Sequence, residues 1–303
     1  MAWGDNAESR ECREQHSATP DLICYIGANK SRESEKSSLS MTNYVISLSS
    51  AQERRTHIQQ EFQRHQLDFE FYDAITPQLN EEKIQTLGLT FQQTNLTAGE
   101  ISCLLSHLSL WQKAIDEQMD YISIFEDDIY LGRNAEDLLS DYVWIPADAH
   151  IIKLEVFAPK IKMAYQKYVQ VPDQRGLYQL NGMHLGCAGY ILSRSACQEL
   201  LQYARGLQDM IAVDHIVFDV FEQSTSYRPY QLSPGICIQS DILKPRQKDI
   251  FNSSLEQARR QRFDVKVAYI KQRLGLQQKI VRECLRVVNQ VISFYQHRSI
   301  RFK

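Results

Sequence analysis

Short apolar runs alternate with helical segments along much of this chain, and this alternation restricts its fold more than any other feature. Residues 44–48 (YVISL) form a β-prone run, and residues 51–65 follow with helical spacing. Residues 68–72, 121–125 and 150–154 are further strand candidates. Strands that alternate with helices form mostly parallel sheets covered by helices, so we predict a doubly wound α/β fold.

A further helix is predicted to begin after Thr97. The Thr97 side chain can accept from the main-chain N–H of Glu100 while the Glu100 carboxylate reaches back to Thr97, which is a capping box. Apolar residues then recur at intervals of three and four, which predicts one buried helix face: Ile101, Leu104, Leu105, Leu108, Trp111 and Ile115.

The composition excludes several classes of protein. Of 303 residues 43% are hydrophobic and 23% charged, which does not fit collagen-like, fully disordered or disulfide-stapled chains. No apolar run approaches the roughly 18 to 20 residues that span a bilayer. Seven scattered cysteines without a Cys-x-x-Cys pair predict reduced thiols in a cytosolic protein, rather than a zinc site or a disulfide framework.

Two changes in composition divide the chain into three parts. Residues 1–40 are polar and predicted to be a disordered leader, with Met41 as a candidate true start of the protein. Residues 41–243 hold the strands and helices, and residues 244–303 form a basic tail. The hypothesis that the leader is dispensable predicts unchanged activity after its deletion.

Three consecutive acidic residues, Glu126, Asp127 and Asp128, directly follow the apolar run 121–125. Side chains alternate in extended chain, so Glu126 and Asp128 face one way and Asp127 the other. Ligands of open α/β sheets bind beyond the carboxyl ends of the strands, and carboxylates there suit Mg²⁺ or Mn²⁺. A solvated acidic turn or a helix N-terminus is the alternative. No glycine-rich nucleotide motif is present, which disfavours dinucleotide-binding and P-loop enzymes.

A series of short motifs occurs in a fixed order between residue 41 and about residue 239: YVISL followed by ERR at 53–55, FEFYDA at 69–74, LTAGEISC at 96–103, SH at 106–107, EDD at 126–128, GCAGY at 186–190, SR at 193–194 and VDH at 213–215. In these motifs the chain resembles glycosyltransferase family 25. This family contains the lipopolysaccharide and lipooligosaccharide galactosyltransferases of Gram-negative bacteria and is related to the collagen galactosyltransferase domains of animals.

The resemblance implies a GT-A type nucleotide-sugar-binding fold, a UDP-sugar donor, Mn²⁺ or Mg²⁺ at an Asp-x-Asp-like motif, and inversion at the anomeric carbon. The motif reads Glu-Asp-Asp here, so Asp128 is the expected direct metal ligand. Glu126 is expected to act as a ligand, through water, or on the ribose. Asp127 stays a donor-binding candidate.

An acid and a histidine late in this region are the candidates for base and second metal group. Inverting transfer needs a base within hydrogen-bond reach of the acceptor hydroxyl. Asp214 is the candidate base, and His215 is the candidate second ligand of the metal or phosphate. The alternative is structural, because an Asp beside a His often only fixes the imidazole tautomer.

Five further residues are candidates with a structural alternative each. Arg54 and Arg55 could reach the diphosphate of the donor, or lie on a solvated helix face. Gly186 and Gly189 could allow the backbone to approach the donor sugar, or mark a bend before a helix near Ser195. His107 could line the site, although a histidine beside an apolar face is more often a packing residue.

Residues 256–303 carry twelve Lys and Arg against three acids, whereas the first 255 residues carry a net charge of −12. Apolar residues with helical spacing among these cations predict a basic amphipathic helix that binds an anionic membrane surface. A packed helix and a nucleic-acid arm are the alternatives, and the acidic remainder of the chain argues against nucleic acid.

Taken with these features, the resemblance implies a metal-dependent, inverting β-galactosyltransferase. It would move galactose from UDP-galactose to a lipid-linked oligosaccharide acceptor, at the cytoplasmic face of the bacterial inner membrane. Two rival functions stay open. One is another nucleotide-sugar transferase or a nucleotidyltransferase, and the other is a non-catalytic carbohydrate-binding relative.

Overall fold

The computed structural model describes residues 41–243 and 297–303. The predicted leader and residues 244–296 of the predicted tail lie outside the described residues. The elements are, in chain order, β1 (Thr42–Ser47), α1 (Gln52–Arg64), β2 (Glu70–Asp73), the 3₁₀ helix η2 (Pro77–Leu79), α2 (Asn80–Thr86), β3 (Gln93–Thr94), α3 (Ala98–Asp116), β4 (Tyr121–Glu126), β5 (Ile129–Leu131), α4 (Glu136–Leu139), β6 (Ile151–Lys153), β7 (Lys160–Lys162), β8 (Val169–Val171), β9 (Arg175–Gln179), β10 (Gly189–Ser193), α5 (Arg194–Gly206), β11 (Asp209–Met210), α6 (Val213–Phe218), α7 (Phe221–Ser224), β12 (Pro229–Ser233), β13 (Cys237–Gln239), α8 (Ser240–Leu243) and β14 (His297–Ser299).

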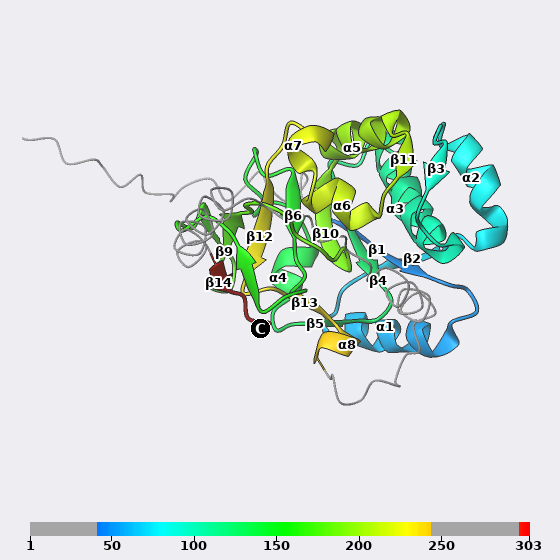
Figure 1. The fold of residues 1–303 in the computed structure, drawn as a ribbon. Coiled ribbons are helices and arrows are strands. Elements are labelled where there is room, and N and C mark those ends of the chain that lie inside the picture. The colour runs from blue at the N-terminus through cyan, green and yellow to red at the C-terminus, as the bar shows by residue number, and fades with distance from the viewer. Residues whose placement is uncertain (1–40, 244–296) are drawn as a thin grey trace, which may run out of the picture. The chain divides into compact units, whose positions relative to one another are not determined.

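The central sheet has eight strands in the order β2-β1-β4-β10-β6-β12-β9-β8 (Figure 1). The prediction of a mostly parallel sheet is wrong, because the sheet is mixed. Strand β1 is parallel to β2 and β4, and β12 is parallel to β6. The other four pairings, β10 with β4 and β6, and β9 with β8 and β12, are antiparallel. Parallel neighbouring strands need a crossover connection, which is usually a helix. No described helix lies between β6 and β10, and these two strands pair antiparallel.

Apolar cores lie on both faces of the sheet, which confirms the α/β class. Alternation along β4 sends Ile122 and Ile124 into the core shared with α3, α5 and α6, and Phe125 into the core shared with α1 and α4. In β10, Tyr190 and Ile191 divide in the same way. The central strands of the sheet are therefore buried between two apolar cores, and the ends of these strands carry polar groups.

Helix α3 begins at the predicted capping box. The Thr97 side chain accepts from the Glu100 N–H, and the Glu100 carboxylate accepts from the Thr97 N–H at 2.8 Å. The helix is buried on more than the one predicted face, because Ser106, His107 and Leu110 are as inaccessible as Trp111. Of these extra buried residues, His107 faces Glu126 at the end of β4, whereas the Ser106 hydroxyl accepts from the Ile75 N–H.

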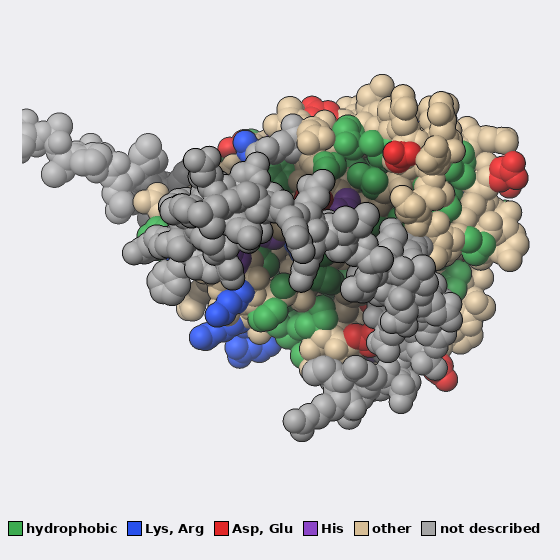
Figure 2. All heavy atoms as spheres, viewed as in Figure 1, with side chains coloured by type: hydrophobic (Ala, Val, Ile, Leu, Met, Phe, Trp, Pro, Cys, Tyr) green, Lys and Arg blue, Asp and Glu red, His purple; other side chains and the backbone are tan. Residues whose placement is uncertain are grey.

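The last seven residues are not helical. Strand β14 pairs antiparallel with β7, Ile300 is buried, and Phe302 packs against the core rather than extending outward. Figure 2 shows Lys and Arg side chains gathered close to this end of the chain, while acidic side chains are scattered over the same face. Among the described residues, no helix has the length and apolar character that a bilayer span requires.

Candidate active site

The acidic motif lies where β4 ends, beside the ends of β1 and β10. Glu126 is the last residue of β4 and is in register with Ile46 of β1. Asp127 and Asp128 form the turn into β5, which pairs antiparallel with β13. The chain therefore presents all three carboxylates at the carboxyl edge of the parallel strands β1 and β4, as the sequence predicts.

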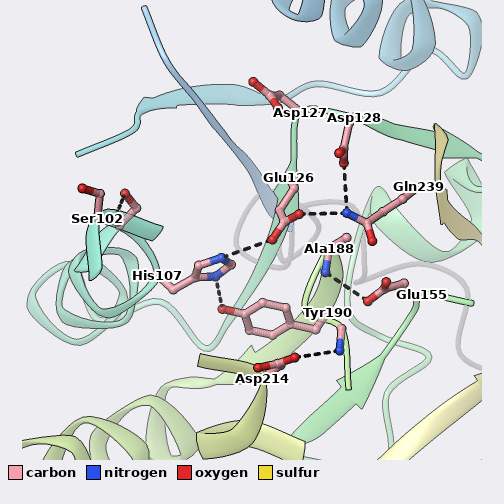
Figure 3. A network of polar contacts seen from close by, with 12 residues as sticks. Ser102, His107, Glu126, Asp127, Asp128, Glu155, Ala188, Tyr190, Asp214 and Gln239 are labelled. Carbon is pink, nitrogen blue, oxygen red and sulfur yellow. Dashed lines mark hydrogen bonds and ion pairs between the residues drawn. The ribbon is translucent and has the colours of Figure 1, made fainter. Parts of the chain in front are cut away.

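The three carboxylates divide between two partners, and Figure 3 shows the first of these, Gln239, in contact with Glu126 and Asp128. The Gln239 amide donates to Glu126 Oε2 at 3.1 Å and to Asp128 Oδ1 at 3.3 Å. Arg54, on α1, contacts Asp127 Oδ1 at 2.5 Å and lies 3.8 Å from Asp128 Oδ2. Glu126 and Asp128 thus converge on one amide while Asp127 contacts Arg54. The two sides are those predicted, but a turn at Asp127 and Asp128, and not extended chain, produces them.

Burial makes the charge of Asp128 unfavourable. It raises the pKa of Asp128 to about 6, since the nearby Arg54 only partly offsets burial and the charge of Asp127 adds to the shift. Burial also lowers the pKa of Arg54, but the charges of Asp127 and Asp128 outweigh it, and the net pKa is raised. A carboxylate whose ionisation is opposed in this way, beside the carboxylate of Glu126, fits a hard divalent cation, because the cation would stabilise the charged form.

His107 contacts a second group of buried residues next to Glu126. Its Nε2 lies 3.9 Å from Glu126 Oε1, and its Nδ1 lies 2.8 Å from the Tyr190 hydroxyl. The indole of Trp111 donates to the same hydroxyl at 3.0 Å. Burial lowers the pKa of His107 to about 4, so the imidazole is neutral near pH 7. His107 is therefore buried as a packing residue, the more frequent role for a histidine beside an apolar face, and it also faces the acidic motif.

The candidate base is held against the segment that leads into β10. Asp214 Oδ2 accepts from the Gly186 N–H at 3.1 Å, and Oδ1 accepts from the His215 N–H at 3.0 Å. Gly186 has a φ of +86°, and a Cβ there would lie 2.8 Å from both Glu155 carboxylate oxygens. The glycine is thus required for the local conformation. The carboxylate of Asp214 is near enough to raise the pKa of His107 against the effect of burial.

A buried ion pair supports that segment from below. Lys153 Nζ donates to Glu155 Oε2 at 3.1 Å and to the Leu185 carbonyl at 2.9 Å, and it also donates to the Gly186 carbonyl. The Ala188 N–H donates to the same Glu155 oxygen at 3.0 Å. Sequence patterns did not reveal this ion pair, nor the contact of the Gln239 amide with Glu126 and Asp128. A buried Lys-x-Glu at a strand end is the only local signal.

Three predicted site residues have other contacts. His215 Nδ1 lies 2.8 Å from Asp219 Oδ2, and His215 does not form a close ligand group with Glu126 and Asp128. Arg55 donates to the Ser47 and Leu48 carbonyls and to Asp73, and so ties β1 to β2. A Cβ on Gly189 would lie 2.5 Å from the Cys237 Sγ, so that glycine serves packing.

Comparison with known proteins gives consistent matches. The model of glycosyltransferase family 25 (LPS biosynthesis protein) matches residues 40–217. A Haemophilus influenzae protein named as a glycosyltransferase is 41% identical over 221 residues, covering 72% of this chain and 76% of its own. The lipooligosaccharide biosynthesis protein lic2B of Haemophilus influenzae is 38% identical over 233 residues, covering 74% and 85%.

One further sequence relative and one solved structure also match this chain. The lacto-N-neotetraose biosynthesis glycosyltransferase LgtB of Neisseria meningitidis serogroup B is 35% identical over 208 residues, covering 66% of this chain and 75% of its own. A solved glycosyltransferase involved in the glycosylation of the major capsid of PBCV-1 aligns with a TM-score of 0.36 at 8% identity, covering 74% of this chain and 99% of its own. A structural similarity this low carries no argument.

Proposed function

This chain belongs to glycosyltransferase family 25, and from that premise we propose that it transfers galactose from UDP-galactose to a terminal sugar of lipooligosaccharide. The transfer inverts the anomeric carbon, gives a β linkage and uses Mn²⁺ or Mg²⁺, on a GT-A type nucleotide-sugar domain. Relatives named for lipooligosaccharide and lacto-N-neotetraose biosynthesis support the acceptor class.

The carboxylate pair at the end of β4 carries the proposal. Glu126 and Asp128 share one amide donor, Gln239, and burial opposes the ionisation of Asp128. These oxygen atoms are the chain's candidates to hold the cation, with His215 outside the pair. When bound, Mn²⁺ or Mg²⁺ supplies positive charge that stabilises the departing diphosphate. Arg54 stays in contact with Asp127 and holds the turn in place beside the donor.

Asp214 is proposed to take the proton from the acceptor. The acceptor hydroxyl oxygen forms a bond to the anomeric carbon while the bond from that carbon to the diphosphate oxygen breaks, and UDP leaves with the electron pair. The acceptor proton passes to a carboxylate oxygen of Asp214. Two main-chain N–H groups fix this carboxylate, so its position does not depend on bound sugar.

A panel of UDP-sugars tests the proposal. UDP release is measured with and without Mn²⁺, and the linkage of the product is determined by NMR. The proposal expects Mn²⁺-dependent UDP release that is fastest with UDP-galactose, and a β-linked product. Release of pyrophosphate instead of UDP would indicate a nucleotidyltransferase. Binding of UDP-galactose without any turnover would indicate a non-catalytic relative.

Residues 256–303 are proposed to bind an anionic membrane surface at the cytoplasmic face of the inner membrane, where a lipid-linked acceptor would lie. The excess of cations there supports this. Co-sedimentation with phosphatidylglycerol vesicles tests it. A variant with Arg259, Arg260 and Arg262 changed to Gln keeps β14 and is expected to bind more weakly. Equal binding of the two chains to anionic and neutral vesicles would contradict the proposal.

A further inference from the structure

A thiol, an imidazole and a carboxylate meet beside the acidic motif. Cys103 and His107 lie four residues apart on α3 and so share a helix face. Glu126 reaches them from the end of β4. One ligand atom from each of the three lies within 4.8 Å of the other two, and no other group of three or more such residues in 41–243 and 297–303 meets this condition.

The buried imidazole points to a ligand. His107 is fully buried, and its Nε2 has no hydrogen-bond partner within the described structure. Leaving such a group unsatisfied costs about 1 to 3 kcal/mol. Figure 3 shows the ring directed at Glu126, with Tyr190 on its other side. The contact between Nδ1 and the Tyr190 hydroxyl fixes the ring, as the outer partners of metal-bound histidines do.

We propose that Cys103, His107 and Glu126 bind Zn²⁺ as three protein ligands, with water in the fourth position. A thiolate, an imidazole and a carboxylate suit Zn²⁺, whereas Mn²⁺ and Mg²⁺ prefer the all-oxygen set of Glu126 and Asp128. Ligand atoms of a tetrahedral zinc site lie about 3.4 to 3.6 Å apart. The separation of 3.9 Å between His107 Nε2 and Glu126 Oε1 is close to this, so a small movement of the side chains completes the site.

This site has a chemical consequence for the carboxylate cluster. The proposed zinc ligand Glu126 also accepts from Gln239. Zn²⁺ bound to Cys103 would draw Glu126 toward α3 and away from Asp128. If the proposed transfer is correct, micromolar Zn²⁺ inhibits it in competition with Mn²⁺. Binding of Zn²⁺ itself does not depend on that function.

Co²⁺ as a spectroscopic substitute for Zn²⁺ tests the ligands directly. Titration of the full chain should give a near-ultraviolet thiolate-to-cobalt band and the visible bands of tetrahedral Co²⁺, which one equivalent of Zn²⁺ removes. Cys103→Ser should abolish the thiolate band and weaken Zn²⁺ binding more than about 100-fold. Cys187→Ser, a buried cysteine outside the proposed site, and Asp128→Asn should both keep the band.

Alkylation of the unaltered chain provides a test without substitutions. Zn²⁺ is expected to slow the reaction of Cys103 with iodoacetamide at least tenfold, and Mn²⁺ is expected to leave the rate unchanged. Peptide mass spectrometry measures the rate of alkylation at Cys103. Two results would overturn the proposal. One is a thiolate band that persists in Cys103→Ser, which would place Co²⁺ on another cysteine, and the other is unprotected Cys103 in saturating Zn²⁺.

Discussion

Two groups of charged residues, each at the end of a sheet strand, differ in how completely their charges are neutralised. At the end of β6, the buried Lys153 and Glu155 pair with each other and with main-chain groups, and of their polar side-chain atoms only Glu155 Oε1 has no hydrogen-bond partner among the described residues. At the end of β4, Glu126 and Asp128 share a neutral amide, and burial holds the pKa of Asp128 at about 6. The first group contains its own cation, Lys153, whereas Asp128 in the second group keeps a raised pKa and favours a bound cation.

Gly186 connects the first group to the candidate base, Asp214. Its carbonyl accepts from Lys153, and its N–H donates to Asp214. The rigid pair below therefore sets the position of the candidate base above. This difference shows that a buried charge by itself does not mark a site. A functional site is better indicated by a charged group that the folded chain neutralises only in part and that lies where substrate can reach it.

Asp214→Asn gives the largest expected effect and separates base chemistry from position. The Asn side-chain oxygen can still accept from the Gly186 N–H, which keeps the contact to the segment before β10, while the contact to the His215 N–H and the proton acceptor are lost. Turnover is expected to fall about 10⁴-fold, with UDP affinity unchanged within about twofold. Steady-state kinetics and calorimetry with UDP and Mn²⁺ measure the two quantities. Equal losses in both would assign Asp214 to donor binding instead.

Asp128→Ala is expected to remove a ligand of the proposed divalent cation and so weaken its binding. Turnover should fall about 10³-fold, because the diphosphate loses the stabilisation that a bound metal provides. Mn²⁺ should also cease to strengthen UDP binding in calorimetry. Asp127→Ala is the matched control, since Asp127 faces Arg54, and it is expected to keep the Mn²⁺ effect. Loss of the Mn²⁺ effect in the control alone would move the metal site to Asp127.

Lys153→Met tests whether the β6 group is purely structural. It leaves Glu155 buried without its cation, which is expected to lower the free energy of unfolding by about 3 kcal/mol. The double change Lys153→Met with Glu155→Leu should recover part of that loss. Glu126→Gln, on a less buried carboxylate, should cost less than about 1 kcal/mol. Urea unfolding at pH 7 measures the free energy of unfolding of the three variants. Similar losses in Lys153→Met and Glu126→Gln would show that the two groups of charges contribute alike to stability.

His184→Gln gives the smallest expected effect and appears only at acid pH. Burial, aided by the charge of Lys153, lowers the pKa of His184 from 6.5 to about 4. The unfolded chain therefore binds the proton more tightly, and this residue's contribution to stability is lost as the pH falls from 6.5 toward 4. From pH 7 to pH 5 the loss is about 2 kcal/mol.

The Gln variant can still donate to the Asn181 carbonyl, which His184 Nε2 contacts at 3.2 Å. It should therefore lose about 2 kcal/mol less than the unaltered chain between pH 7 and pH 5. Urea unfolding at both values measures this difference. An identical pH dependence in the two chains would show that His184 is already protonated in the folded state at pH 5.

Local sequence patterns predicted those elements whose cause is local. The apolar runs gave β1 and β4 within two residues, and the capping box placed the start of α3 at Thr97. The strand direction of β10 was not predictable, because no local pattern records which way a strand returns to the sheet. Gln239 contacts Glu126 across more than a hundred residues, so only the folded chain shows that contact.

The site residues divide in the same way. The position of Glu126 and Asp128 after an apolar strand was readable, because alternation and strand ends are local properties. Which of two adjacent arginines turns toward the acids was not, since helix packing decides that Arg54 does and Arg55 does not. The charge of His107 and its unpartnered nitrogen also depend on burial, which a sequence pattern does not specify.

The reversed direction of β10 decides which loop can reshape the site. The chain enters β10 at Gly189, at the edge where it leaves β4 and β6, and it leaves at Ser193 about 13 Å away. Adding or removing residues just before Gly189 therefore changes the loop that lies beside Glu126, Asp127 and Asp128. A length change directly after Ser193, where α5 begins, lies at the opposite edge of the sheet. Residues 181–188 can diverge in length and shape what the site admits while the sheet beneath keeps its register.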